Sequence, residues 1–242
     1  LARPLLGLAG SWVTVLLLRS VDRIGKGLRS APRDAMVADA TPSHMRGFAF
    51  GFHRALDNAG AVAGGLTAAA ILAWSDLSLS EVIVWSAVPG FVAVLLLGAG
   101  VKVEPNNIES APKPAQTLPP LRWSALSLPM QHYLWVLMVF TFARASETFI
   151  LLLGHQLGIG VVELLLLWSA LNLAKALTST QGGQLADRFG HGSLIVIGWS
   201  SLALAFLALS QVTGSSELWL VSIGYCLLIG MSEGAERALI SD

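Results

Sequence analysis

Long apolar stretches separated by short connections dominate this chain of 242 residues. A helix that crosses a bilayer needs about 20 mostly apolar residues. Hydrophobic residues make up 54% of the chain and charged residues 12%, whereas a soluble domain has about 25% charged residues. A soluble fold could not bury so much apolar surface, so the sequence predicts an all-α integral membrane protein in contact with the lipid bilayer. The expected spans are roughly 12–38, 47–73, 82–101, 132–153, 161–179, 193–211 and 217–238, and residues 1–7 look like the end of an earlier span.

Basic residues gather in every second connection. The connections near 74–81 and 154–162 contain no Lys or Arg, and Trp12, Trp74 and Trp219 fall at the ends of spans on this side. Cytoplasmic loops carry an excess of Lys and Arg, and Trp anchors helices at the membrane surface. This side is therefore expected to face outward, and the protein is expected to be a multi-pass protein of the plasma membrane. The net charge of zero gives no electrostatic reason to expect a nucleic-acid partner. The basic residues that predict the cytoplasmic side are Arg23, Lys26, Arg29, Arg33, Arg46, Lys102, Lys113, Arg122 and Arg188.

A weak internal repeat indicates two halves. Residues 27–39 align with residues 230–242 with three identities, Gly27/Gly230, Ala35/Ala238 and Asp39/Asp242. Both segments end a predicted span on the predicted cytoplasmic side, six spans apart. Residues 102–128 form a Pro-, Asn- and Ser-rich cytoplasmic linker. The order of the spans predicts two six-span halves of parallel topology, with residues 1–101 in the first half and residues 129–242 in the second. The lack of an initial Met suggests that the chain is a fragment.

A polar turn joins the predicted spans 161–179 and 193–211. Its sequence runs Gly183-Gln-Leu-Ala-Asp187-Arg188-Phe-Gly190-His-Gly. Gly183 and Gly190 permit a tight turn. Asp187 is expected to meet the N-terminus of a neighbouring helix, where free N–H groups and the helix dipole favour an anion. The alternative is an ordinary turn in which Arg188 only sets the topology.

Two charged groups and a small-residue face mark the first half. Arg19 lies well inside an apolar span, where a charge costs at least about 2.5–3.5 kcal/mol, so we expect it to face a cavity and to pair with Asp22, one turn away. The alternative is a structural pair that only supports packing. Asp57 is expected to pair with Arg54, three residues earlier. A face of small residues that allows close helix packing is also expected, formed by Gly60, Gly64 and Gly65.

Charges also lie inside the predicted spans of the second half. Arg144 and Glu147 are three residues apart, and Lys175 lies in the next span near Asn172. Ionisable groups inside a membrane are functional candidates by default. Glu147 could carry a proton, since desolvation favours the neutral acid, or pair with Arg144 as a structural lock. For Lys175 the alternative is that its amine reaches back to the cytoplasmic surface.

These segments resemble the major facilitator superfamily over the whole chain. Residues 183–192 are similar to the family's loop signature G-x-L-A-D-R-x-G-R-R, with His191 and Gly192 in place of the usual basic pair. Arg19 matches an Arg of the family's fourth helix that is tied to proton coupling. The run Gly60-Ala-Val-Ala-Gly64-Gly65 resembles the antiporter motif G-P-x-x-G-G, with Ala in place of Pro.

A further resemblance covers residues 23–34, which are similar to the DR-x-GKG-x-R-x-APRDA segment of a bacterial subgroup. The resemblance implies a partial fold with the end of helix 3 and helices 4 to 10, in a bacterial inner membrane. It also implies alternating access and a coupling role for Arg19. As ionisable groups in or beside the spans, the further coupling or charge candidates are Asp22, Asp57, Arg144, Glu147 and Lys175.

The leading functional prediction is a secondary transporter of a small solute, coupled to protons and acting in efflux as a monomer. An uptake symporter, a non-transporting membrane sensor and a membrane-embedded enzyme are the alternatives. No catalytic or metal-binding motif is found, and the Gly-Lys-Gly run lacks the spacing of a phosphate loop. We therefore expect no enzyme activity and no cofactor, and the substrate itself does not follow from these residues.

Overall fold

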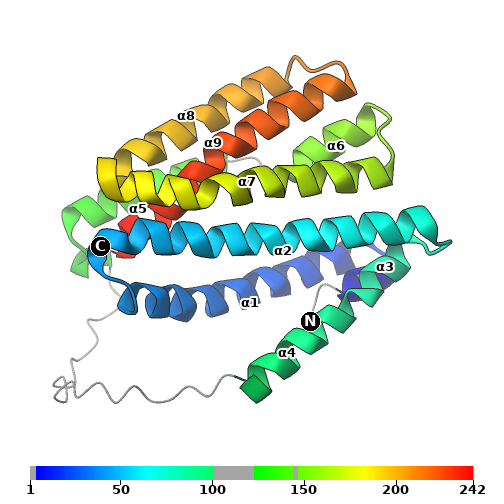
Figure 1. Ribbon diagram of the computed structural model, residues 1–242, viewed down its shortest axis with the longest axis horizontal. Helices are drawn as coiled ribbons and strands as arrows, with labels where there is room; N and C mark the ends of the chain where they lie inside the picture. Colours follow the sequence, from blue (N-terminus) through cyan, green and yellow to red (C-terminus); the bar gives the residue numbers. More distant parts are fainter. Residues whose placement is uncertain (1–3, 101–122, 144–146, 242) are drawn as a thin grey trace. The chain divides into compact units, whose positions relative to one another are not determined.

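The computed structural model describes residues 4–100, 123–143 and 147–241. Over these residues the secondary structure is helical and contains no strand, which confirms the predicted class (Figure 1). Packing divides the chain into two compact units, one of Leu1–Ala87 with Glu147–Asp242 and one of Val88–Ser146. The helices are η1 (Pro4–Leu8), α1 (Trp12–Asp39), η2 (Ser43–Met45), α2 (Arg46–Trp74), α3 (Leu79–Trp85), α4 (Ala87–Gly100), η3 (Trp123–Ala125), α5 (Leu128–Ala143), α6 (Thr148–Gln156), α7 (Val161–Phe189), α8 (His191–Leu209) and α9 (Ser215–Ser241).

Helices cover the described residues of every predicted span, with three differences. The predicted span 12–38 is helical as α1, but the charged residues of its second half keep it below the apolarity of a typical span. The predicted span 132–153 is divided between α5 and α6. Residues Lys102, Lys113, Arg122, Arg144 and Asp242 lie outside the described residues. In the described part of the chain, the stretches long and apolar enough to cross a membrane are Ser43–Trp74, Leu79–Leu96, Val161–Phe189, His191–Leu209 and Ser215–Leu239.

The predicted span 82–101 starts earlier than expected and contains a break. A capping box begins α3, in which the Glu81 N–H donates to Ser78 Oγ at 3.3 Å and the Ser78 N–H donates to Glu81 Oε2 at 2.7 Å. The break falls at Ser86, between α3 and α4. Pro89 accounts for it, because proline has no N–H to bond the carbonyl of Trp85 and its ring crowds that carbonyl.

The first unit is built around the contact between α2 and α7, which run side by side (Figure 1). Glycines bring the two backbones together near one end: a Cβ at Gly51 would overlap the Ser179 carbonyl, and one at Gly183 would overlap the Gly47 carbonyl. Farther along α2, a Cβ on Gly65 would overlap the Ser169 side chain. The contact residues Gly47, Gly51 and Gly65 are four and fourteen residues apart, about one and four helical turns, so they share one face of α2.

The predicted packing role is seen for Gly65, and for the other two glycines it stays a prediction. A Cβ on Gly60 or Gly64 would meet no atom of the described residues within 4 Å. Gly64 is one residue from Gly65 and is rotated about 100° away from the α7 contact. The sequence showed a cluster of small residues, but their face could be assigned only once α7 was in place.

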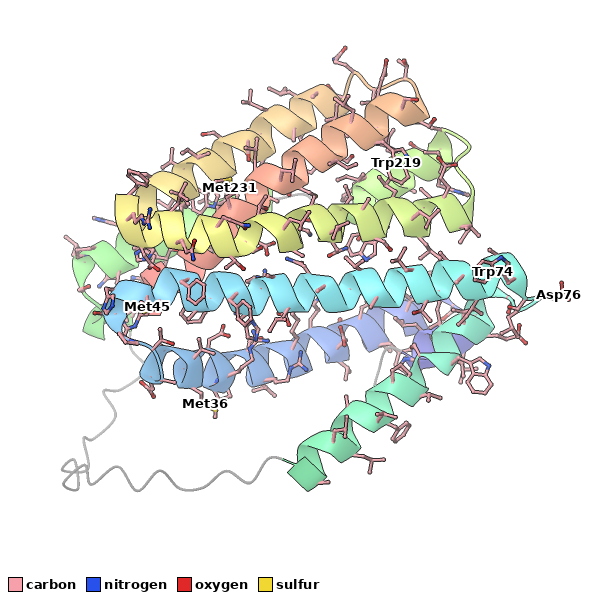
Figure 2. All side chains as sticks on the ribbon, viewed as in Figure 1. Met36, Met45, Trp74, Asp76, Trp219 and Met231 are labelled. Carbon is pink, nitrogen blue, oxygen red and sulfur yellow. The ribbon has the colours of Figure 1, made fainter. Side chains whose placement is uncertain are left out.

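The two ends of the first unit carry different residues. Trp74, Asp76 and Trp219 lie at one end, and Met36 and Met45 lie at the opposite end (Figure 2). The Trp-bearing end matches the predicted outer side. Arg33, Arg46 and Arg188 belong to the helix ends on the other side, which matches the predicted cytoplasmic side, here called the inner end. The orientation in a membrane stays a prediction.

Candidate functional site

Asp187 stands near the C-terminus of α7 and caps the N-terminus of α2. Its Oδ1 accepts the Gly47 N–H at 2.8 Å, and its Oδ2 accepts the Phe48 N–H at 2.8 Å. The first N–H groups of a helix have no partner within the helix, so the carboxylate supplies hydrogen-bond acceptors for two of these groups. The predicted contact with a neighbouring helix N-terminus is thus present, and it joins residues 140 positions apart in the chain. A role for Asp187 in transport stays a prediction.

The rest of the loop motif supports this carboxylate. Gly183 lies one turn before Asp187 and allows the close approach of α2. Gly190 separates α7 from α8 with φ of +91°, a region that favours glycine. His191 takes part where the family has a basic residue, with its Nε2 3.5 Å from Asp187 Oδ1. Arg188 is exposed, in keeping with a topology signal.

We predict that Asp187→Asn slows transport several-fold while leaving the protein folded and inserted. The variant loses the negative charge and one of two acceptors, an effect of about 1 kcal/mol, or about fivefold in a conformational equilibrium. The measurement is the initial rate of solute flux in liposomes that contain the full-length protein. Asp76→Asn, an exposed acid at the opposite end, is the control. A normal rate in Asp187→Asn would show that the motif is only a turn.

Lys175 and Glu147 form a buried ion pair. Lys175 Nζ lies 2.7 Å from Glu147 Oε2, and the side chains are 6% and 16% exposed. The Lys175 ammonium also lies 5.8 Å from the centre of the Trp168 ring, within the range of a cation–π contact. Asn172, buried on the same helix, donates its side-chain amide to the Trp168 carbonyl at 2.7 Å.

This pair settles one alternative for Lys175. A lysine that reached back to the membrane surface would expose its amine, whereas this amine is buried against an acid from the start of α6. The surface reading is therefore wrong. The proposed partner Arg144 lies outside the described residues, and the sequence did not suggest Lys175 as the partner of Glu147.

A second group of charges, here called the inner cluster, joins α1, α2 and α9. Asp57 Oδ2 lies 3.8 Å from Arg54 Nη1, which confirms the predicted pair, and also 3.8 Å from Arg33 Nη1 on α1. Arg54 Nε lies 3.1 Å from the buried Glu233 of α9. The charged members of the inner cluster are Arg33, Asp34, Arg54, Asp57, Glu233 and Arg237.

Asp34 and Arg237 complete the inner cluster and support the internal repeat. The two side chains pair with each other across α1 and α9. They are 203 residues apart, which is the offset of the aligned segments 27–39 and 230–242. Equivalent positions of two repeats touch only near the axis that relates them. The sequence contains a signal of this contact, because Arg33-Asp34 aligns with Glu236-Arg237 in the repeat, with the charges inverted.

The structure does not bring Arg19 into either group. Arg19 is exposed on α1, and Asp22 is partly buried. Its predicted pairing with Asp22 and its position toward a cavity stay predictions.

Comparison with known proteins relates the chain to a family of membrane transporters. An uncharacterized MFS-type transporter of Methanocaldococcus jannaschii is 27% identical over 98% of this chain and 60% of its own length. An uncharacterized protein of Mycobacterium tuberculosis is 29% identical over 99% of this chain and 59% of its own length. The chain thus spans about three-fifths of these relatives, and no solved structure matches it. Residues 1–241 match the Major Facilitator Superfamily, and the chain belongs to that family.

Proposed function

We propose that the chain is part of a secondary active transporter that moves a small solute across the plasma membrane. Two helix bundles would alternate in exposing a central site to each side, as parallel repeats allow. Protons would supply the energy, export would be the direction, and the protein would work as a monomer in a bacterial inner membrane. The family and the apolar helices support the class, and the Lys175–Glu147 pair supports the coupling.

The ion pair can respond to a proton because each partner depends on the other. An ionised Glu147 compensates the buried Lys175 ammonium at 2.7 Å. Protonation of Glu147 would remove that charge and leave a buried cation without its acid, which is costly. The Trp168 ring offers Lys175 a second contact. A proton on Glu147 would therefore favour a rearrangement of α6 and α7, and that rearrangement is the coupling step in this proposal.

The proposed direction, export, is based on the glycine run in α2. The run from Gly60 to Gly65 resembles the antiporter motif, and two of its three glycines lie away from the α7 contact. They are therefore available to a function other than packing on α7. An uptake symporter is the other outcome of the test below.

The test uses the full-length protein in liposomes with an imposed pH gradient and a small panel of solutes. We predict that Glu147→Gln together with Lys175→Met abolishes proton-driven solute movement but retains solute exchange at equal pH. Exchange shows that the variant is folded and binds the solute. Glu163→Gln, an exposed acid in the first turn of α7, is the matched control and should keep its coupling.

The direction of movement follows from the same assay. Solute that moves against the proton flow supports export by exchange, and solute that moves with the protons indicates uptake. Unchanged proton-driven transport in the double variant would contradict a coupling role for this pair.

A further inference from the structure

The inner cluster is balanced in charge if its one histidine is neutral. Its three carboxylates face three guanidinium groups, as the ion pairs between them show. His53 lies on α2, one turn before Asp57 and inside the same group. Its side chain is 25% exposed, which leaves it close to water at the inner end. A proton on His53 would give the cluster a fourth cation for three acids.

His53 has a position open for that proton. Its Nδ1 atom is buried and has no hydrogen-bond partner among the described residues. Asp57 Oδ2 lies 3.7 Å from it, slightly beyond hydrogen-bond distance. The other charges that act on His53 come from α1 and α9, and they are those of Arg33, Asp34 and Arg237.

We propose that His53 is a proton-binding site and that its protonation loosens α1 from α2 and α9. A proton on Nδ1 creates a donor beside Asp57 and draws this carboxylate away from Arg33, its partner on α1. The new cation also repels Arg33 and Arg237. The cluster holds α1 through Arg33–Asp57 and Asp34–Arg237, so both ties become weaker.

Thermodynamic linkage gives the same conclusion in reverse. If the proton favours the loosened state, the loosened state must hold the proton more tightly than the closed state. Separation of α1 and α9 would then take up a proton from the inner side, and closure would release it. The inference extends the proposed function, because opening of this end is one step of alternating access, but its test does not depend on transport.

The test measures access to a side chain that the closed inner end covers. Ala238 on α9 is fully buried and packs with Ala38 of α1 and Phe50 of α2. The full-length protein would carry Ala238→Cys, with the native Cys226 changed to Ser, and would be labelled with a maleimide at a series of pH values. Thiol reactivity itself varies with pH, so each rate is divided by that of Met36→Cys, an exposed position at the same end.

The expected result is a rise of about fivefold in this ratio between about pH 8 and pH 5.5, the range in which histidine titrates. His53→Gln is expected to keep the ratio low at every pH. His44→Gln is the matched control, because His44 is an exposed histidine near the same end, and it should preserve the rise.

Three results would overturn the inference. The first is a flat ratio with His53 in place, and the second is a rise that persists in His53→Gln. The third concerns Asp57→Asn, which removes the acceptor shared by His53, Arg33 and Arg54. That variant should be labelled quickly at every pH, so a low ratio that still rises with acid would contradict the mechanism. None of these outcomes depends on Glu147 or on the solute, so the proposed function can fail or survive independently.

Discussion

Replacing Lys175 with Met should lower the free energy of unfolding by about 3–5 kcal/mol, the typical effect of leaving a buried charge without its partner. Met keeps the length and apolar character of the lysine stem, so the packing of this buried position is largely preserved. The loss arises from Glu147, whose carboxylate is 16% exposed and would have no cation at 2.7 Å. Denaturant or thermal unfolding of the purified full-length protein in detergent measures the effect.

The control for this prediction is the variant in which both partners are neutral. Adding Glu147→Gln to Lys175→Met should recover most of the lost stability, because replacing a buried ion pair as a whole is often close to neutral. The difference between the single and double variants isolates the interaction of the two side chains. Equal stability losses in the single and double variants would show that the carboxylate is well solvated without Lys175.

The second large effect is expected at Gly183. Gly183→Val would force side-chain atoms against the Gly47 backbone, and overpacking of this kind costs about 1–3 kcal/mol, sometimes more. Moving α2 away from α7 would also break the two hydrogen bonds to Asp187. We therefore expect a lower unfolding temperature and slower transport together.

Gly192 supplies the matched control within the same loop. A Cβ there would meet no described atom within 4 Å, and the residue does not share the positive φ of Gly190. Gly192→Ala should change the stability by less than about 0.5 kcal/mol. If Gly183→Val were as stable as Gly192→Ala, the close contact between α2 and α7 would not exist in the protein.

The features that the sequence predicted well are local ones. The presence of the helices follows from apolar run length, although α7 continues to Phe189, ten residues beyond its predicted end. Asp187 could be assigned to a helix N-terminus because the free N–H groups and the dipole of a helix favour an anion there. The Arg54–Asp57 pair was predictable for the same reason, since residues three apart share a helix face.

The features that it missed depend on which helices pack together. Glu147 pairs with a lysine 28 residues away on another helix, and no spacing rule connects them. Asp34 and Arg237 meet across 203 residues, and only the inverted charges of the repeat hinted at it. Of Gly60, Gly64 and Gly65, only Gly65 contacts α7, and the sequence could not single it out because the three glycines are nearly equivalent until α7 selects one side.

Two of the polar contacts that join distant helices, the Asp187 cap and the Lys175–Glu147 pair, differ in how easily water can replace them. Asp187 and the N–H groups of Gly47 and Phe48 lie at a helix end, where water can bind all three groups if α2 and α7 separate. Lys175, whose side chain is 6% exposed, carries a full charge that needs an acid beside it as long as the amine stays buried. The cap of α2 is therefore a contact that holds α2 against α7 but can be broken at a small cost in free energy. The buried pair can separate only when another partner, such as a proton on Glu147, compensates the lost contact.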